Sequence, residues 1–378
     1  MTGARPTEAT NYSPGLEGVV GGETAVSTLA DGLRYRGYLI EELAEHATFE
    51  EVAHLLLHGE LPSAEQLTAF SKRLAAAAHV PTEIIDTLRK LPNDAPTMDV
   101  MRTGCSLLAH WDPDVNDNST SANLRKAERL VAQLPVILAA RARLVAGKEP
   151  VSPDATRSWS SNLLWMIHRR EPSESWIKAM DVSAILYAEH EFNASTFTAR
   201  VVASTLSDLH SSITAAIGAL KGPLHGGANE RVLEVLQQVG SADKAEAWVR
   251  DALARKVRIM GFGHRVYKDV DPRSELIKRY CDQLATETGN QEMEQIAATL
   301  ERIVRGEKKL PPNVDWPSAR LYYYMKLPVN LYTPLFVIAR VTGWSAHVIE
   351  QLSHNRLIRP DSIYTGVASR TYVPLAQR

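Results

Sequence analysis

Apolar residues recur at helical spacing along most of the chain. In "TFEEVAHLLLHGELPSAEQL", Thr48 precedes an apolar run, and Glu51 three residues later completes a capping box. The residues that follow at helical spacing are Phe49, Val52, Ala53, Leu55 and Leu56. The pattern predicts a helix that begins after Thr48.

Further start and stop signals divide the helical pattern into separate helices. Gly59 and Pro62 predict the end of the first helix, and Ser63 with Gln66 predicts the cap of the next. The segments 243–256 ("DKAEAWVRDALARK") and 291–304 ("QEMEQIAATLERIV") are amphipathic and rich in Ala, Glu and Leu, which favours two more helices.

Strand-like alternation is confined to the N-terminal part of the sequence. It occurs around "EGVVGGETAVSTL" and "GLRYRGYLI", and no strand–helix–strand rhythm follows. A Rossmann fold or a TIM barrel is therefore disfavoured, and an all-α fold is predicted. The polar stretch 110–124 ("HWDPDVNDNSTSANL") is predicted to be a surface connection.

Composition narrows the class of protein without placing a domain boundary. The 378 residues suggest about two domains, with 44% hydrophobic and 23% charged residues. The net charge of −2 argues against nucleic acid or an anionic membrane as a partner. Cys105 and Cys281 lie far apart, so neither a disulfide framework nor structural zinc is expected. The first twenty residues lack an apolar signal core, and 130–140 is too short to span a bilayer; we expect a cytoplasmic protein.

Four stretches combine titratable groups with turn-forming residues or depart from helix-forming composition. They are "YAEHEFNASTFTAR" (187–200), "KGPLHGGANE" (221–230), "MGFGHRVYKDVDPRS" (260–274) and "PPNVDWPSA" (311–319). A zinc site is not supported, because the position four after His190 is Ala194 rather than a second ligand. A dinucleotide fingerprint is also lacking, since "GFGH" has no third glycine, although a turn near Arg265 and Lys268 could hold a phosphate. No metal or cofactor is expected.

Acid–base chemistry is the remaining interpretation of these stretches. His225, His264 and Asp315 could move protons near neutral pH without a cofactor. Three arginines stand beside Pro, Gly or apolar residues, as the clamps of a dicarboxylate would: Arg273, Arg340 and Arg359. The bland alternative for each is a structural histidine or a surface ion pair. A structural role is expected for five other histidines, which lie on or beside helical stretches: His46, His54, His58, His79 and His110.

The blocks "GPLHGGANE", "MGFGHRVYK", "DPR", "PNVDW" and "TPLFVIARVTGW" occur in the order found in the citrate synthase family, which includes 2-methylcitrate synthases. The sequence resembles this family from about "GLEGVV" to "IRPDSIYTG". The resemblance implies a nearly all-helical homodimer. It also implies a large domain (1–219 and 326–378) that carries the dimer interface, and a smaller, mobile helical domain (220–325).

The resemblance also implies the role of each candidate residue. Asp315 matches the base, His225 the donor to the thioester carbonyl, and His264 the acid that protonates the oxaloacetate carbonyl. The residues matched to oxaloacetate binding are His190, Arg273, Arg340 and Arg359, the last reaching in from the partner subunit. Those matched to coenzyme A are Arg258, Ile259, Met260, Gly261, Phe262 and Lys268.

The implied reaction condenses an acyl-CoA with oxaloacetate and hydrolyses the resulting thioester. Citrate synthase, using acetyl-CoA, is the first expectation, and 2-methylcitrate synthase, using propionyl-CoA, is the close alternative. One methylene is worth only about 1–3 kcal/mol in a pocket, so the residues do not decide between them. A catalytically silent helical dimer that binds coenzyme A is the alternative from another class.

Overall fold

The computed structural model describes residues 12–264, 267–367 and 369–378. The chain is 63% helix and 2% strand, which confirms the predicted all-α fold. Within the described residues, none of the helices has both the length and the apolar character that crossing a bilayer requires.

A small antiparallel sheet lies near the N-terminus, where the sequence predicted the strands. Its strands, in spatial order, are β1 (Ser27–Thr28), β2 (Arg34–Tyr35) and β3 (Tyr38–Leu39). Tyr35 pairs with Tyr38 across a two-residue loop, Arg36 and Gly37, whose φ angles are 48° and 93°. Two positive φ values are what a tight hairpin turn requires, so Gly37 suits its position.

Both predicted helix caps are present. Helix α2 (Phe49–His58) begins with the Thr48–Glu51 capping box and ends at Gly59, which is left-handed with φ 93°. Helix α3 (Ala64–Ala77) begins with the Ser63–Gln66 box. The reciprocal bonds satisfy N–H groups that the first helical turn leaves without partners.

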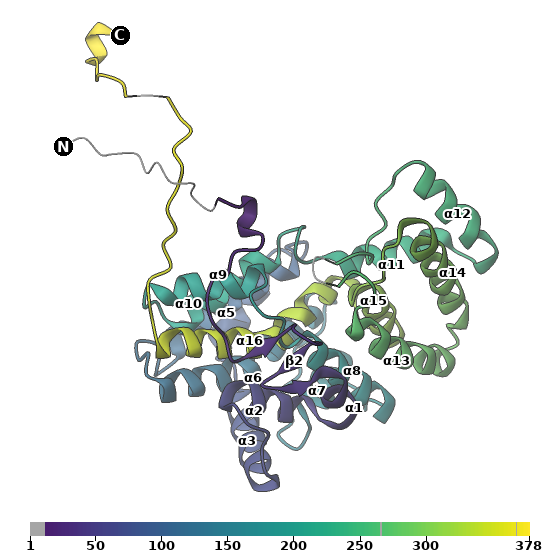
Figure 1. Cartoon of the computed structure of the whole chain (residues 1–378). Helices are drawn as coiled ribbons and strands as arrows, with labels where there is room; N and C mark the ends of the chain where they lie inside the picture. Colours follow the sequence, from purple (N-terminus) through teal and green to yellow (C-terminus); the bar gives the residue numbers. More distant parts are fainter. Residues whose placement is uncertain (1–11, 265–266, 368) are drawn as a thin grey trace.

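The larger group of helices packs around α16 (Tyr332–Ser353), which is buried along most of its length (Figure 1). Its neighbours include α6, α8, α9 and α10. The remaining helices of this group are α1 (Ile40–His46), α4 (Thr82–Lys90), α5 (Thr97–Leu108), α6 (Thr120–Val145), α7 (Trp159–His168), α8 (Glu174–Tyr187), α9 (Ala194–Ser204) and α10 (Leu209–Leu220). Short 3-10 turns occur at Pro14–Leu16, Ala109–Trp111, Val329–Leu331 and Leu375–Gln377.

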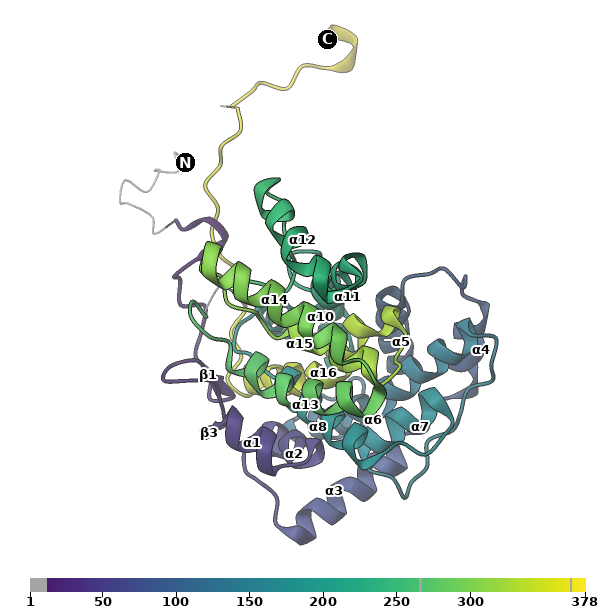
Figure 2. The ribbon, with the colours of Figure 1, turned by 90° about the vertical axis from the view of Figure 1, so that its right-hand side faces the viewer.

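A second group of helices lies to one side of the first (Figure 1). It comprises α11 (Ala228–Val239), α12 (Ala242–Ala254), α13 (Pro272–Thr288), α14 (Gln291–Lys308) and α15 (Asp315–Tyr324). Helix α13 packs against α8 and α1 of the larger group, and Figure 2 shows it in front of them. This group falls within 220–325, but its independence and mobility stay predictions.

The stretch 110–124 is more firmly held than a polar surface connection suggests. Asp112 is buried, and its carboxylate accepts two hydrogen bonds from Arg129 at 2.9 and 2.6 Å. Asp114 accepts from both Arg125 and Arg129. Paired guanidinium contacts of this kind hold an irregular segment that has no regular backbone hydrogen bonding.

Candidate active site

Asp315 is the first residue of α15 and is held from two sides. Its backbone N–H donates to Asn313 Oδ1 at 3.1 Å, and the Tyr187 hydroxyl donates to Asp315 Oδ1 at 3.0 Å. Burial raises the pKa of Asp315 to about 6, and the Tyr187 hydrogen bond opposes that rise. The carboxylate can therefore take up and release a proton close to neutral pH.

His225 lies on the turn between α10 and α11. A Cβ at Gly226 would overlap the Leu220 carbonyl oxygen, so only glycine allows the turn to close against α10. His225 Nε2 accepts the backbone N–H of Ser195 at 3.3 Å and lies 2.8 Å from Ser195 Oγ. The contact with the backbone N–H, which can only donate, fits a neutral ring with its proton on Nδ1. Burial, reinforced by the Arg340 charge, lowers the pKa of His225 to about 4, which keeps the ring neutral.

His264 lies beside a buried arginine. The Tyr267 backbone N–H donates to His264 Nδ1 at 3.3 Å, and Arg273 Nη2 is 3.5 Å from Nε2. Burial and the Arg273 charge lower the pKa of His264 to about 4. Asp271 binds Arg273 through both carboxylate oxygens, at 3.0 and 2.9 Å. Burial alone would lower the pKa of Arg273, but Asp271 outweighs it and raises that pKa.

His190 and Arg340 complete the set of polar groups. His190 Nε2 is 3.2 Å from the Tyr267 hydroxyl, and its ring centre is 5.3 Å from that of His264. Burial, followed by the charges of Arg273 and Arg340, lowers the pKa of His190 well below its ordinary value. Arg340 donates from Nε to the Tyr187 carbonyl, and burial lowers its pKa to about 10. Among the described residues, no carboxylate lies within 4.0 Å of the Arg340 guanidinium.

Phe336 connects the two sides of this region. Its ring centre is 4.5 Å from that of Tyr187 and 6.5 Å from that of His225, and the Arg340 guanidinium is 4.5 Å above the ring. Asp315 reaches the same aromatic group through Tyr187. The structure therefore brings together six of the seven predicted catalytic and oxaloacetate residues: His190, His225, His264, Arg273, Asp315 and Arg340.

Arg359 is not part of this cluster within one chain. It follows α16 in the C-terminal segment, which Figure 1 shows as an extended yellow trace. Its side chain is 77% exposed, and Asp361 lies 3.7 Å away. No contact between Arg359 and the other six is present among the described residues. A position on another subunit stays a prediction.

The predicted coenzyme A segment forms a loop beside the strand-like segment that leads to Asp315. Phe262 and Pro312 form an isolated antiparallel bridge, and the Asn313 N–H donates to the Gly261 carbonyl at 2.9 Å. Gly261 has φ 88°, and a Cβ there would crowd Val232 and Trp316. The close packing at Gly261 therefore fixes the position of this loop.

The flanks of that loop carry the remaining predicted residues. Arg258 is exposed, Ile259 is buried and Met260 is partly buried. Lys268 is exposed, with Nζ 3.5 Å from the His264 carbonyl. Arg265 lies outside the described residues.

The sequence did not single out four residues that shape the site: Tyr187, Ser195, Tyr267 and Phe336. Each lies within or next to a motif that contains one of the predicted residues. A tyrosine or serine carries no charge pattern, and Ser195 acts partly through its backbone N–H, so composition alone gives no signal for them. Their roles follow from contacts that only the folded chain makes.

Comparison with known proteins identifies the family. The profile described as "Citrate synthase, C-terminal domain" matches residues 15–361. A 2-methylcitrate synthase from Shewanella oneidensis is 45% identical over 96% of this chain and 97% of that protein. Citrate synthase 2 from Bacillus subtilis is 46% identical over 96% of this chain and 98% of that protein.

A solved structure agrees with these sequences. It is the ternary complex of carboxymethyl coenzyme A and oxaloacetate with citrate synthase from the archaeon Thermoplasma acidophilum. The two chains are 34% identical, with a TM-score of 0.91 over 98% of this chain and 100% of that one. The predicted resemblance is confirmed: the chain belongs to the citrate synthase family and is an acyltransferase of the citrate and 2-methylcitrate synthase kind.

Proposed function

We propose that the protein condenses acetyl-CoA with oxaloacetate and water to give citrate and coenzyme A. The observation that carries this proposal is the pairing of two groups around Phe336. Asp315 has a pKa raised to about 6 by burial, and His225 is neutral with its proton on Nδ1. A base and a neutral donor are what enolisation of a thioester needs.

In the first step, Asp315 removes a proton from the α-carbon of the thioester. The α-carbon is a weak acid, so the charge that develops on the carbonyl oxygen must be stabilised at the same time. His225 donates its Nδ1–H to that oxygen. Because the Ser195 N–H occupies Nε2, the ring cannot turn its proton away from the substrate without losing that bond.

In the second step, the enol carbon attacks the ketone carbon of oxaloacetate. His264 protonates the ketone oxygen as the new carbon–carbon bond forms, and His190 donates a further hydrogen bond. Arg273 and Arg340 hold the carboxylates. Water then hydrolyses the thioester and releases coenzyme A, whose adenine and phosphates we assign to 258–262 and Lys268.

We further propose a homodimer in which Arg359 completes the oxaloacetate site of the partner subunit. Two observations support this proposal. The Arg359 side chain is 77% exposed. The C-terminal segment that follows α16 extends away from the helices of its own subunit (Figure 1). An arginine on such a segment can reach a second copy more readily than its own buried site. Residues 220–325 act as a domain that closes over the substrates.

Propionyl-CoA is the second candidate substrate, because the relatives do not separate the two activities. Relatives named citrate synthase and 2-methylcitrate synthase match this chain almost equally, at 46% and 45% identity. The test compares kcat/KM for acetyl-CoA and for propionyl-CoA, each with oxaloacetate. The rate is measured as the release of free thiol. A higher value for acetyl-CoA supports the proposal, and a higher value for propionyl-CoA replaces it with 2-methylcitrate synthesis. Release from neither would leave a coenzyme A-binding helical protein.

A further inference from the structure

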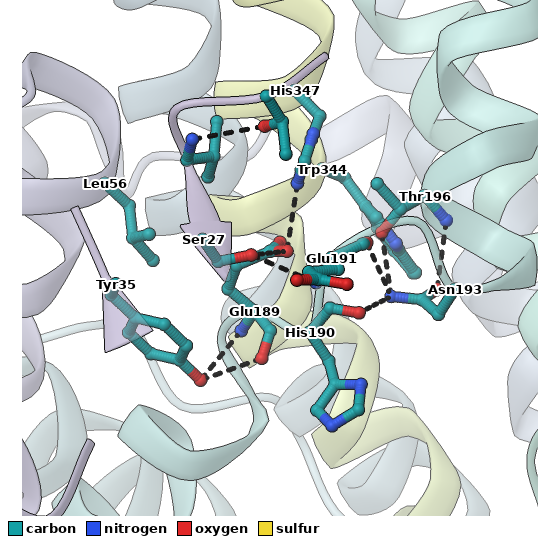
Figure 3. A network of polar contacts seen from close by, with 12 residues as sticks. Ser27, Tyr35, Leu56, Glu189, His190, Glu191, Asn193, Thr196, Trp344 and His347 are labelled. Atoms are coloured by element: carbon teal, nitrogen blue, oxygen red, sulfur yellow. Dashed lines mark hydrogen bonds and ion pairs between the residues drawn. The ribbon is translucent and has the colours of Figure 1, made fainter. Parts of the chain in front are cut away.

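The turn between α8 and α9, residues 188–193, presents His190 to the site and is braced by a buried polar network. Figure 3 shows this network, with His347 on one side of Glu189 and His190 on the other. The Glu189 carboxylate is fully buried, and its Oε1 accepts from His347 Nε2 at 2.9 Å and from Ser27 Oγ at 2.9 Å. Two donors from distant parts of the chain therefore meet at the residue next to His190.

The orientation of His347 follows from its other neighbour. Arg200 Nη1 is 2.8 Å from His347 Nδ1, and a guanidinium can only donate. Nδ1 is therefore the acceptor, and the proton on Nε2 is directed at Glu189. Arg200 is itself held by Glu350 at 2.7 Å, so the imidazole is fixed at both nitrogens.

The same network fixes the backbone on the other side of His190. Ser27 Oγ, which donates to Glu189, also accepts the Glu191 N–H at 3.0 Å. Glu191 has φ 50°, a left-handed conformation that is uncommon for a residue with a side chain. The Tyr35 hydroxyl donates to the Glu189 carbonyl at 2.8 Å. Both peptide units that flank His190 are thus tied to groups outside the turn.

A purely structural turn would not need a buried carboxylate. Burying a charged group is costly, and apolar residues of similar volume often stabilise a core as well or better. Here space is also reserved for the carboxylate, because a Cβ at Gly343 would overlap Glu189 Oε2 and the Ala188 carbonyl. A network of this kind does supply direction, which a substrate-binding imidazole requires.

We propose that His347 and Glu189 are positioning residues for the oxaloacetate half of the site: they fix the turn that aims His190, without touching substrate. This inference rests on the proposed function. It predicts that loss of the network weakens oxaloacetate recognition selectively, because the acyl-CoA contacts come from His225 and 258–262.

The test compares His347→Leu with His347→Gln. Leucine removes both hydrogen bonds, whereas the glutamine amide can donate to Glu189 and accept from Arg200. We expect His347→Leu to weaken the oxaloacetate Kd, measured by calorimetry without acyl-CoA, and to lower kcat/KM for oxaloacetate by about 100-fold. The KM for acyl-CoA should change less than about twofold, and His347→Gln should recover most of the loss.

His210→Leu is the matched control, because His210 is also a buried histidine, 1% exposed, and it does not contact this turn. It should leave the oxaloacetate Kd unchanged. If His347→Leu does not fold, Ser27→Ala carries the test with the same readouts and a smaller loss. An unchanged oxaloacetate Kd, or equal losses for both substrates, would overturn the inference. If the wild type binds oxaloacetate but releases no thiol, the proposed function fails. The comparison of oxaloacetate Kd values still decides whether His347 and Glu189 position the turn.

Discussion

The carboxylate of Asp315 is balanced between two opposing influences. Burial favours its neutral form and raises the pKa to about 6, while the Tyr187 hydroxyl, 3.0 Å away, favours the charged form. Tyr187 also contacts Ser318 Oγ at 2.7 Å, which helps to keep the hydroxyl in place. A carboxylate tuned in this way is ionised near neutral pH and still basic enough to accept a proton.

Tyr187→Phe should therefore move the acidic limb of the pH–rate profile to higher pH. Without the hydroxyl, the charged carboxylate loses a donor, so its pKa rises further and activity is lost at a less acidic pH. The measurement is kcat/KM for acyl-CoA from pH 5 to 9. Tyr324→Phe, which removes a hydroxyl bonded to Glu294 in the second group of helices, serves as the control. An acidic limb that stays in place would contradict this assignment.

At this scale the sequence indicated charged residues that the structure brings together, but not the groups that orient them. Histidines and carboxylates beside glycine or proline stand out from a helical background, so His225, His264 and Asp315 could be found. Tyr187 is 128 residues from Asp315 along the chain, and nothing in its own surroundings indicates that pairing. Contacts of this kind depend on how helices pack, which a local pattern does not contain.

Helix α8, which leads to the His190 turn, contains an unusual buried acid. Asp181 is 6% exposed and accepts from Ser160 Oγ at 2.5 Å. Burial, with the nearby Glu50 carboxylate, raises the pKa of Asp181 to about 7. An unfolded aspartate ionises near pH 4, about three units lower. The native state therefore holds this proton more tightly than the unfolded state does. The bound proton contributes to the free energy of unfolding below about pH 4, and this contribution is lost as the pH rises to about 7.

Asp181→Asn should consequently raise the melting temperature more at pH 8 than at pH 5. The amide oxygen can still accept from Ser160, and no charge must be buried at high pH. Differential scanning calorimetry of wild type and variant at both pH values measures the difference. An equal shift at both pH values would show that the ionisation of Asp181 does not affect stability.

The helices themselves were the most predictable elements. The capping residues Thr48 and Ser63 act within three residues of their partners, so the sequence contains the whole signal. The segment after Ala109 was less predictable, because Asp112 is buried by Arg129, which comes from the next helix. The capping signals, which act over three residues, predicted the helix starts correctly. The burial of Asp112 depends on a residue of another helix, and the local sequence did not predict it.

For the whole molecule, closure of residues 220–325 over the substrates is expected on oxaloacetate binding. A reactive enolate must be kept from water, and the group of helices α11 to α15 contacts the rest mainly through a few helices (Figures 1 and 2). Small-angle scattering should show a smaller radius of gyration with oxaloacetate. Identical profiles with and without the ligand would count against closure.

The assignment of Arg359 to the partner subunit can be tested by mixing two inactive variants. Arg359→Ala and Asp315→Asn are each expected to be nearly inactive, but a hybrid dimer contains one site with both residues intact. After subunit exchange, activity should recover to about a quarter of the wild-type level, since half of the dimers are hybrids with one working site. No recovery, with exchange verified by native mass spectrometry, would place Arg359 in its own subunit's site or outside the site.

The fold class was predictable from periodicity alone, because helical spacing with little alternation leaves few other folds. The spatial arrangement was not: the six residues of the candidate site come from five separate stretches that meet only after packing. Arg359 illustrates the remaining limit. Its proposed partners belong to a second copy of the chain, so neither the sequence nor a single subunit can show them.

The proposed role of Asp315 is tested by measuring coenzyme A release by wild type and Asp315→Asn, with oxaloacetate and either acetyl-CoA or propionyl-CoA. Circular dichroism and the oxaloacetate Kd, unchanged between the two proteins, would show that the fold and the second substrate site are intact. We expect turnover by the wild type and a loss of about 1,000-fold in the variant. Near-normal release by Asp315→Asn would contradict it.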